Sequence, residues 1–363
     1  MTDGEQPITI AGSRSTDHDQ RITVNGSRST DHGQPITANV PTIEPTYRAP
    51  AWLPGPHLQT IAPARLLPLP RVQYRRERWD APDGDFVDVD FAQPEPAAPG
   101  APVLVLFHGL EGCSRSHYAL SVMRAAADRG WRGLVPHFRG CSGEPNRLPR
   151  AYHSGDSDEG DWILRAVARR CPGAPLFAVG ISLGGNMLAK WLGERETEAG
   201  FVTAAASIGS PLDLAAGGAA LARGFNMLYT RMFLATLRRK TLAKIERFPG
   251  VASAEAVLAS RNLYEFDNAY TAPVHGFRDA DDYWRRASGK PWLGGVAVPH
   301  LVLNALNDPF VPAASLPLPR EVSRFVHLEQ PAHGGHVGFA GGPLPGRLDY
   351  LPRRLIGFFE RGQ

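Results

Sequence analysis

Ser182 stands inside a glycine-flanked segment, residues 180–184 (GISLG), whose residue types could support nucleophilic catalysis. An apolar run at residues 176–179 precedes it, and residues 186–192 have the pattern of a helix. A sharp turn between a strand and a helix exposes a serine hydroxyl, and it needs glycines where the backbone comes close to itself. The GISLG string alone is weak evidence. Because it lies between a strand and a helix, we predict that Ser182 is a nucleophile.

A serine hydroxyl becomes a good nucleophile when a base takes its proton, so a histidine and an orienting acid should follow Ser182. His336 lies in the glycine-rich segment of residues 333–339, and Asp308 comes shortly after an apolar run at residues 300–305. Both positions are expected at the carboxyl edge of a sheet, where open α/β sheets place their active sites. Ser182, Asp308 and His336 are therefore the predicted catalytic residues.

Three other residues compete for the roles of base and acid. His333 lies three residues before His336, and His327 is expected inside a strand. We prefer His336 over both as the base. Asp213 follows an earlier apolar run and is an alternative acid, because in some proteins with this kind of sheet the catalytic acid follows that earlier strand. Asp308 is preferred because it directly follows a strongly apolar run.

The negative charge of a tetrahedral intermediate is usually stabilised by two backbone N–H groups. The apolar run of residues 103–107 ends in the segment 108–112 (HGLEG), which is a suitable turn for one donor. The amides of Leu110 and Leu183 are the candidates for this oxyanion hole. His108 precedes the glycine turn, and we expect it to make a structural hydrogen bond and to have no catalytic role.

Short apolar runs alternate with helical segments through most of the chain. Continuous apolar runs are typical of parallel strands covered on both faces, so the fold class is predicted to be α/β with a mostly parallel, doubly wound sheet. Residues 72–91 alternate around Gly84 and predict a preceding hairpin. The core strands are predicted at residues 103–107, 133–136, 176–179, 204–208, 300–305 and 325–328.

About residues 215–298 separate two of the predicted strands, which is too long for a simple crossover. We interpret this insertion as a helical lid or cap over the pocket. A helical appendage without substrate contact is the alternative. Within residues 221–247, apolar side chains alternate with Arg and Lys as in amphipathic helices: Phe225, Leu228, Met232, Leu237 and Ile245.

The amino-terminal part contains a tandem repeat of 14 residues, at residues 7–20 and 21–34. Two polar copies are too few to stack into a solenoid. We expect residues 1–45 to be a disordered tail and residues 46–363 to form the folded domain. The repeated histidines have only aspartate as a nearby ligand type, so no metal site is expected.

Composition limits the partners and the compartment. The chain has 39 Lys and Arg against 36 Asp and Glu, a net charge of +3 that is too small to indicate a nucleic-acid partner. Three widely spaced cysteines predict no disulfide framework and favour a cytoplasmic location. No apolar run of signal-peptide or membrane-spanning length is present in the sequence, while peripheral membrane contact and the oligomeric state stay open.

Taken together, these motifs resemble the YheT-like branch of the α/β-hydrolase superfamily, which includes animal α/β-hydrolase-domain lipases. The resemblance extends from about residue 46 to the end of the chain. Pro56 stands where relatives commonly have glycine. Besides the segments around Ser182 and Leu110, the likeness depends on residues 56–60 (PHLQT), 138–146 (FRGCSGEPN), 150–155 (RAYHSG) and 334–339 (GGHVGF).

This resemblance implies the α/β-hydrolase fold, an esterase or lipase-like activity on acyl esters, no cofactor, and Ser182, Asp308 and His336 as the triad. The leading hypothesis is a carboxylic ester hydrolase that forms an acyl-serine intermediate. One alternative is an acyltransferase that uses the same acyl-serine step. The other is a catalytically inactive hydrolase fold that serves as a binding module.

Three further features have a chemical interpretation that we set aside. His153 and Asp158 have the spacing of a glycerolipid acyltransferase motif, which occurs often by chance. Arg139 and Arg147 could bind an anionic group, but arginines in loops are more often solvated or paired structurally. Cys141 shows no sign of a depressed thiol pKa, so it is not expected to be a nucleophile.

Overall fold

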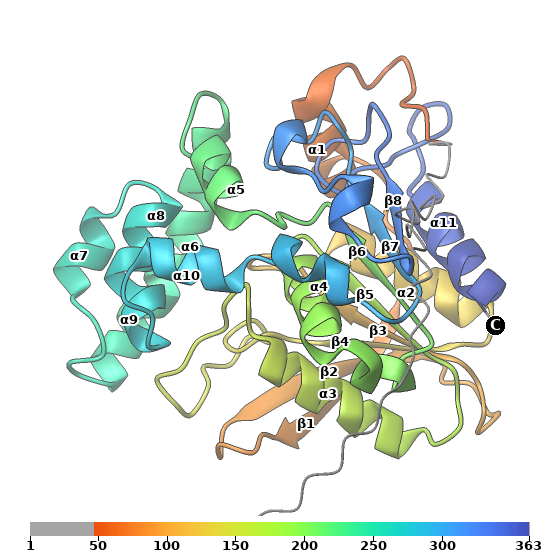
Figure 1. Cartoon of the computed structure of the whole chain (residues 1–363), viewed down its shortest axis with the longest axis horizontal. Helices are drawn as coiled ribbons and strands as arrows, with labels where there is room; N and C mark the ends of the chain where they lie inside the picture. The colour runs from red at the N-terminus through yellow and green to blue at the C-terminus, as the bar shows by residue number, and fades with distance from the viewer. Residues whose placement is uncertain (1–46, 363) are drawn as a thin grey trace, which may run out of the picture. The chain divides into compact units, whose positions relative to one another are not determined.

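The computed structural model describes residues 47–362, so the predicted tail of residues 1–45 lies outside the described part of the chain. The described residues form one mixed sheet (Figure 1). Its strands are β1 (Gln73–Asp80), β2 (Phe86–Gln93), β3 (Val103–Phe107), β4 (Arg132–Pro136), β5 (Leu176–Ile181), β6 (Ala204–Ile208), β7 (His300–Leu303) and β8 (Val326–Glu329).

The strand order across the sheet is β1-β2-β4-β3-β5-β6-β7-β8. β1 and β2 form the predicted antiparallel hairpin, and β2 joins β4 antiparallel. From β4 to β8 every neighbouring pair is parallel, which confirms the predicted mostly parallel sheet. β5 extends to Ile181, two residues beyond the predicted strand, because Ile181 still pairs with Ile208 of β6.

Helices cover both faces of the sheet. Alternate side chains of a strand point to opposite faces. Accordingly Val103, Val105 and Phe107 pack in one apolar cluster, while Leu104 and Leu106 pack in another. The first cluster includes α3 (Ser157–Arg170) and α4 (Leu183–Arg195), and the second includes α2 (His117–Asp128) and α11 (Tyr350–Phe359).

Between β6 and β7 the chain forms a group of helices that lies to one side of the sheet in Figure 1, coloured green to cyan. We call residues 214–287 the cap. It lies within the predicted insertion, and its function as a lid stays a prediction. Its helices are α5 (Leu214–Leu221), α6 (Asn226–Arg247), α7 (Ala254–Ala259), α8 (Leu263–Phe266), α9 (Ala272–Val274) and α10 (Ala280–Ala287).

α6 is the long amphipathic helix of the cap, although its two halves differ. In the second half, Leu237 and Ile245 pack against the apolar cluster of the cap. In the first half, the apolar side chains named from the sequence face solvent, because the helix turns Tyr229 and Leu234 inward instead. The exposed fractions are 52% for Phe225, 47% for Leu228 and 47% for Met232.

None of the helices within residues 47–362 has both the length and the apolar character that crossing a lipid bilayer requires.

Candidate active site

Ser182 occupies the turn between β5 and α4 in a strained backbone conformation, with φ 51° and ψ −115°. Non-glycine residues rarely adopt such a positive φ. The turn is tight enough that a Cβ on Gly180 would lie 2.4 Å from the carbonyl oxygen of Gly184. The N–H of Ser182 donates to the carbonyl of Ile208 at 2.8 Å, which anchors the turn to β6. The side chain therefore has a defined position at the carboxyl edge of the sheet.

The fold brings together the three residues predicted to act in catalysis. His336 Nε2 lies 2.9 Å from Ser182 Oγ, and His336 Nδ1 lies 2.9 Å from Asp308 Oδ2. The other carboxylate oxygen of Asp308 accepts the N–H groups of Phe310 and Val311. Since a carboxylate only accepts, Nδ1 carries the proton and Nε2 is free to accept the serine proton.

The three residues that competed for the roles of base and acid lie away from Ser182. Asp213 is the N-cap of α5, where its Oδ1 accepts the N–H of Ala216 at 3.0 Å. His327 belongs to β8, as expected. His333 is exposed, and its closest polar contact is Asn307 at 3.5 Å. In the described residues, none of the three has a hydrogen bond to Ser182 or to Asp308.

The loop that carries His336 is held by α1 (Gly55–Arg65), which contains the PHLQT segment. Thr60 Oγ1 accepts the N–H of His336 at 2.9 Å. Gln59 Oε1 accepts the N–H of Gly334 at 2.9 Å, and its Nε2 donates to the carbonyl of Leu53. The sequence analysis used this segment only as part of a resemblance. No local pattern in the sequence signalled this positioning role, because both contacts reach residues more than 270 positions further along the chain.

The geometry around Leu110 and Leu183 suits an oxyanion hole. Both residues line the same pocket as Ser182 and His336. Within residues 47–362, neither amide N–H donates to a protein acceptor. The remaining N–H groups of the loop are occupied: Gly109 donates to Tyr118 Oη, Glu111 to Tyr152 Oη, and Gly112 to the carbonyl of Gly109.

His108 is fully buried and has a structural position, as its place before the glycine turn indicated. Its Nδ1 contacts the carbonyl of Gly109 at 2.8 Å, and its Nε2 accepts the N–H of Phe138 at 3.1 Å. Burial lowers the pKa of His108 to about 3, so the ring is neutral at physiological pH. Both nitrogens hold the loop of residues 108–112, which we call the oxyanion loop because it carries the candidate donor Leu110.

His153 and Cys141 line the same pocket as Ser182, but in the described residues neither they nor Asp158 has a hydrogen bond to the three predicted catalytic residues. Asp158 is 89% exposed and pairs with Arg195, so it forms no unit with His153. Burial lowers the pKa of His153 to about 3. Burial also raises the pKa of Cys141 to about 12, which is the opposite of an activated thiol.

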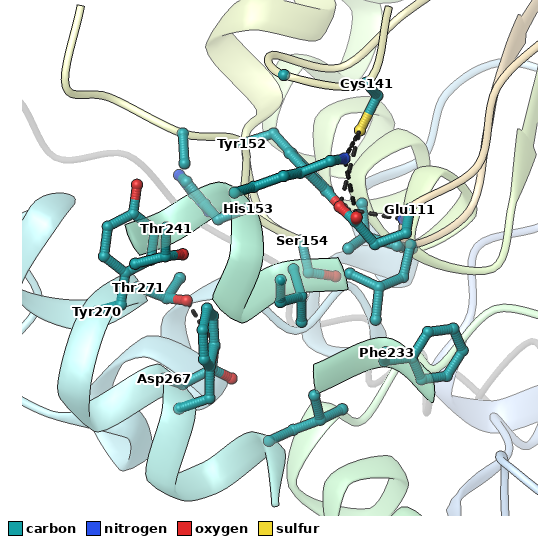
Figure 2. A pocket seen from close by; sticks show the side chains of 18 of the residues that line it. Glu111, Cys141, Tyr152, His153, Ser154, Phe233, Thr241, Asp267, Tyr270 and Thr271 are labelled. Carbon is teal, nitrogen blue, oxygen red and sulfur yellow. Dashed lines mark hydrogen bonds and ion pairs between the residues drawn. The ribbon is translucent and has the colours of Figure 1, made fainter. Parts of the chain in front are cut away.

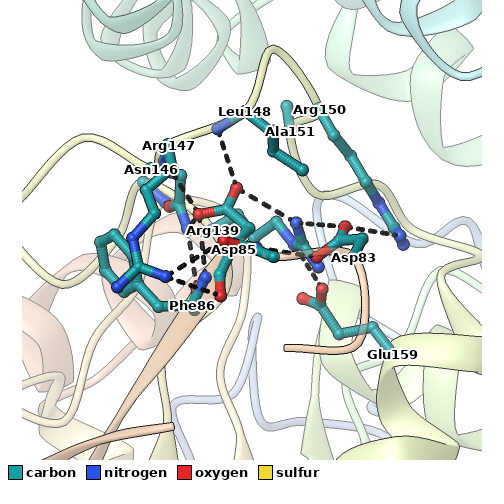
Figure 3. Close-up of polar contacts among 12 residues, drawn as sticks. Asp83, Asp85, Phe86, Arg139, Asn146, Arg147, Leu148, Arg150, Ala151 and Glu159 are labelled. Carbon is teal, nitrogen blue, oxygen red and sulfur yellow. Dashed lines mark hydrogen bonds and ion pairs between the residues drawn. The ribbon is translucent and has the colours of Figure 1, made fainter. Parts of the chain in front are cut away.

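Arg139 is 2% exposed and forms a buried ionic cluster (Figure 3). Its guanidinium contacts Glu159 at 2.5 Å, Asp83 at 2.8 Å and Asp85 at 3.2 Å. Burial, followed by the neighbouring Asp156, raises the pKa of Glu159 to about 7. With three carboxylates around it, Arg139 joins the turn before β2 to α3. It is not available to an anionic ligand.

A pocket of about 570 Å³ lies over the serine and is shared by the core and the cap. Its lining includes Ser182, Leu183, Leu110 and His336 from the core. Figure 2 shows part of this lining. The cap contributes mostly apolar side chains: Leu214, Leu221, Phe233, Leu237, Leu263 and Phe266. An acyl chain would therefore find an apolar environment beside the serine.

Asp267 is a carboxylate within this largely apolar lining, and Figure 2 shows it beside Thr271. Its oxygens accept the hydroxyl of Thr271 at 2.6 Å and the indole N–H of Trp284 at 2.8 Å. Burial raises the pKa of Asp267 to about 6, and the two hydrogen bonds only partly oppose this shift.

The raised pKa of Asp267 predicts a specific dependence of stability on pH. The folded protein holds this proton up to about pH 6, whereas the unfolded chain releases it near the ordinary aspartate pKa of 3.8. The contribution of Asp267 to the free energy of unfolding is thus lost as pH rises through this window, by about 3 kcal/mol. Asp267→Asn cannot ionise, so its Tm relative to wild type should rise between pH 4 and 7. Thermal melts of both proteins would measure this, and a constant difference in Tm would contradict it.

The comparisons with known proteins agree with the fold. Residues 102–343 match the family model described as the alpha/beta hydrolase fold, and the chain belongs to this family. It is 42% identical over 301 residues to YheT of Escherichia coli (strain K12), covering 82% of this chain and 88% of YheT. This similarity confirms the YheT-like branch that the motifs indicated.

One further relative and one solved structure extend the comparison. Phospholipase ABHD3 of Mus musculus is 30% identical over 327 residues, which cover 88% of this chain and 79% of that protein. The solved structure of the Pyrococcus furiosus esterase Pf2001 superposes with a TM-score of 0.51 at 15% identity, covering 88% of this chain and 98% of that one. At this low identity the structural likeness shows the fold alone.

Proposed function

We propose that the protein is a serine hydrolase that cleaves carboxylic esters through an acyl-serine intermediate. The observation that carries the proposal is the hydrogen-bonded chain of Ser182, His336 and Asp308, with both contacts at 2.9 Å. The relatives named above support an esterase or lipase-type hydrolase, since YheT is named as an esterase and ABHD3 as a phospholipase.

In the acylation step, His336 removes the proton of Ser182 while Oγ attacks the acyl carbon. Asp308 holds the required tautomer of the imidazole and stabilises the imidazolium that forms. The carbonyl oxygen gains negative charge and accepts the free N–H groups of Leu110 and Leu183. Collapse of the intermediate breaks the bond to the alcohol oxygen, which takes the proton from His336.

In the deacylation step, His336 acts again as the base, now on a water molecule that attacks the acyl-serine. The second tetrahedral intermediate collapses, Ser182 regains its proton, and the carboxylic acid leaves. Neither step calls on a cofactor or a metal. Covalent labelling by a fluorophosphonate tests the assignment, because the adduct should map to the peptide that contains Ser182.

Two alternative functions are acyl transfer and a catalytically inactive binding module, and the geometry of the site weighs only against the second. Acyl transfer to an alcohol shares the acyl-serine, and no observation on residues 47–362 favours it over hydrolysis. An inactive binding module would not need a hydrogen-bonded triad beside two free amides, so the site weighs against it. Product analysis with an added acceptor alcohol would distinguish hydrolysis from transfer.

We also propose a cytoplasmic location and a surface for peripheral contact with lipid. All three cysteines are free thiols, which suits a reducing cytoplasm. The exposed Leu228 and Met232 on α6, together with Phe225 at its N-cap, are the candidates for peripheral contact with lipid.

The pocket predicts that cap residues limit the length of the acyl chain. Leu237 of α6 lines the pocket, so Leu237→Trp should fill acyl space and lower kcat/KM for long-chain p-nitrophenyl esters about tenfold or more. Turnover of the acetate ester should stay within about twofold. The matched control is Leu258→Trp in α7, because Leu258 is 55% exposed. An equal loss at every chain length would contradict a role of Leu237 in acyl binding.

A further inference from the structure

Glu111 directly follows the candidate oxyanion residue Leu110, and its φ is 55°, a conformation that non-glycine residues rarely adopt. The hydroxyl of Tyr152 stabilises this conformation through two hydrogen bonds. It accepts the N–H of Glu111 at 3.0 Å and donates to Oε1 of the same residue at 2.9 Å (Figure 2). One hydroxyl thus binds both the backbone and the side chain of Glu111.

The second carboxylate oxygen of Glu111 binds the cap. Lys240 of α6 places its Nζ 2.8 Å from Oε2, while the carboxylate itself is only 8% exposed. The neutral thiol of Cys141 lies 3.9 Å from Oε1 of Glu111 and 3.6 Å from Nζ of Lys240. Glu111 is therefore a junction between the oxyanion loop and the cap.

Tyr152 is itself held in a fixed orientation. Its ring stacks on Phe138 with 5.3 Å between ring centroids and 7° between the planes. Phe138 in turn donates its N–H to His108 at the start of the oxyanion loop. Burial raises the pKa of Tyr152 well above its usual value, so its hydroxyl keeps the proton that it donates to Glu111.

These contacts constrain the peptide planes around Leu110. The N–H of Gly109 donates to Tyr118, and the N–H of Glu111 donates to Tyr152. The peptide plane that carries the Leu110 N–H lies between these two hydrogen-bonded planes. This plane shares the Cα atoms of Gly109 and Leu110 with its two neighbours, so a displacement of the Glu111 peptide would also displace the free amide from its place in the pocket of the serine.

We propose that Glu111 is a positioning residue for the Leu110 amide, and that Lys240 makes this position depend on the placement of the cap. The inference rests on the proposed function. An ion pair with a purely structural role would alter stability alone. A positioning role lowers kcat, because the affected amide interacts with the oxyanion only as the charge develops.

The test compares Lys240→Met, Lys240→Arg and Tyr152→Phe on p-nitrophenyl acetate, which is too short to need the apolar lining of the cap. We expect kcat to fall ~10-fold for Lys240→Met and ~100-fold for Tyr152→Phe, with KM within about twofold. Lys240→Arg keeps the charge and should stay near wild type. The variant that combines Lys240→Met with Tyr152→Phe should lose less kcat than the product of the two single fold-losses, because both residues act through Glu111.

A second measurement reports the oxyanion directly. An alkyl trifluoromethyl ketone adds to a catalytic serine as a tetrahedral oxyanion, so its affinity should weaken by the same factor as kcat/KM. The matched control is Arg285→Met, which breaks an ion pair with Asp282 inside the cap at a side chain that is 71% exposed. This variant should keep the activity of the wild type.

The outcomes separate the two claims. If Lys240→Met and Tyr152→Phe lower Tm but leave both kcat and ketone affinity unchanged, the positioning role of Glu111 is overturned while the proposed function stands. If the wild type itself shows no turnover that depends on Ser182, the proposed function fails, and the inference fails with it.

Discussion

Replacing Ser182 with alanine is expected to lower the turnover of an ester such as p-nitrophenyl butyrate by about 10⁶-fold. The reason is chemical, because the variant retains the pocket and the free amides but has no oxygen to accept the acyl group. Its N–H can still donate to Ile208, so the fold should persist with a Tm close to that of wild type. Labelling by a fluorophosphonate should disappear together with turnover.

Ser260→Ala is the matched control for this experiment. Ser260 is a buried serine of the cap whose hydroxyl donates to the carbonyl of Val257, and it does not line the pocket. We expect its variant to keep turnover and labelling within about twofold. Undiminished labelling of Ser182→Ala would refute the assignment of the nucleophile.

Asp308→Asn is expected to lower kcat by about 10⁴-fold. Asp308 Oδ1 accepts the N–H groups of Phe310 and Val311, so an asparagine would keep its oxygen there and present its NH₂ group to His336. His336 Nδ1 must then accept, and the proton moves to Nε2, which faces Ser182. The imidazole can no longer take the serine proton, although it remains in place. Steady-state kinetics at neutral pH would measure the loss.

Asp213→Asn is the decisive comparison, because Asp213 was the alternative acid in the sequence. Its carboxylate caps α5 by accepting the N–H of Ala216, and an asparagine is an equally good N-cap. Turnover should therefore remain within about twofold of wild type. The reverse pattern, with Asp213→Asn inactive and Asp308→Asn active, would move the acid to the earlier strand.

Much of the fold was predictable because its central strands are covered on both faces. β3 and β6 begin and end where their apolar runs do, since nearly every side chain in them is buried. The limits of helices were less predictable. α6 begins at Asn226, and the exposed Leu228 and Met232 within it, with Phe225 at its N-cap, show that apolar residues in a helical segment need not face the core.

The roles of Gln59, Thr60 and Glu111 could not be predicted from their local sequence. Each acts through hydrogen bonds to residues far away in the chain. Thr60 contacts His336 across 276 positions, and Glu111 contacts Tyr152 across 41. Local residue patterns carry no information on such contacts, which arise only when the sheet and the cap are assembled.

The sequence by itself determined the sheet, the turn at Ser182 and the order of serine, acid and histidine, because these depend on local apolar patterns and on glycines at tight turns. Only the tertiary structure placed Asp308, and not Asp213, beside His336, and within residues 47–362 it left the N–H of Leu110 without an acceptor while occupying those of its neighbours. Which carboxylate faces a histidine, and which N–H lacks an acceptor, depends on distances between distant segments. Those distances are set by packing of the whole domain.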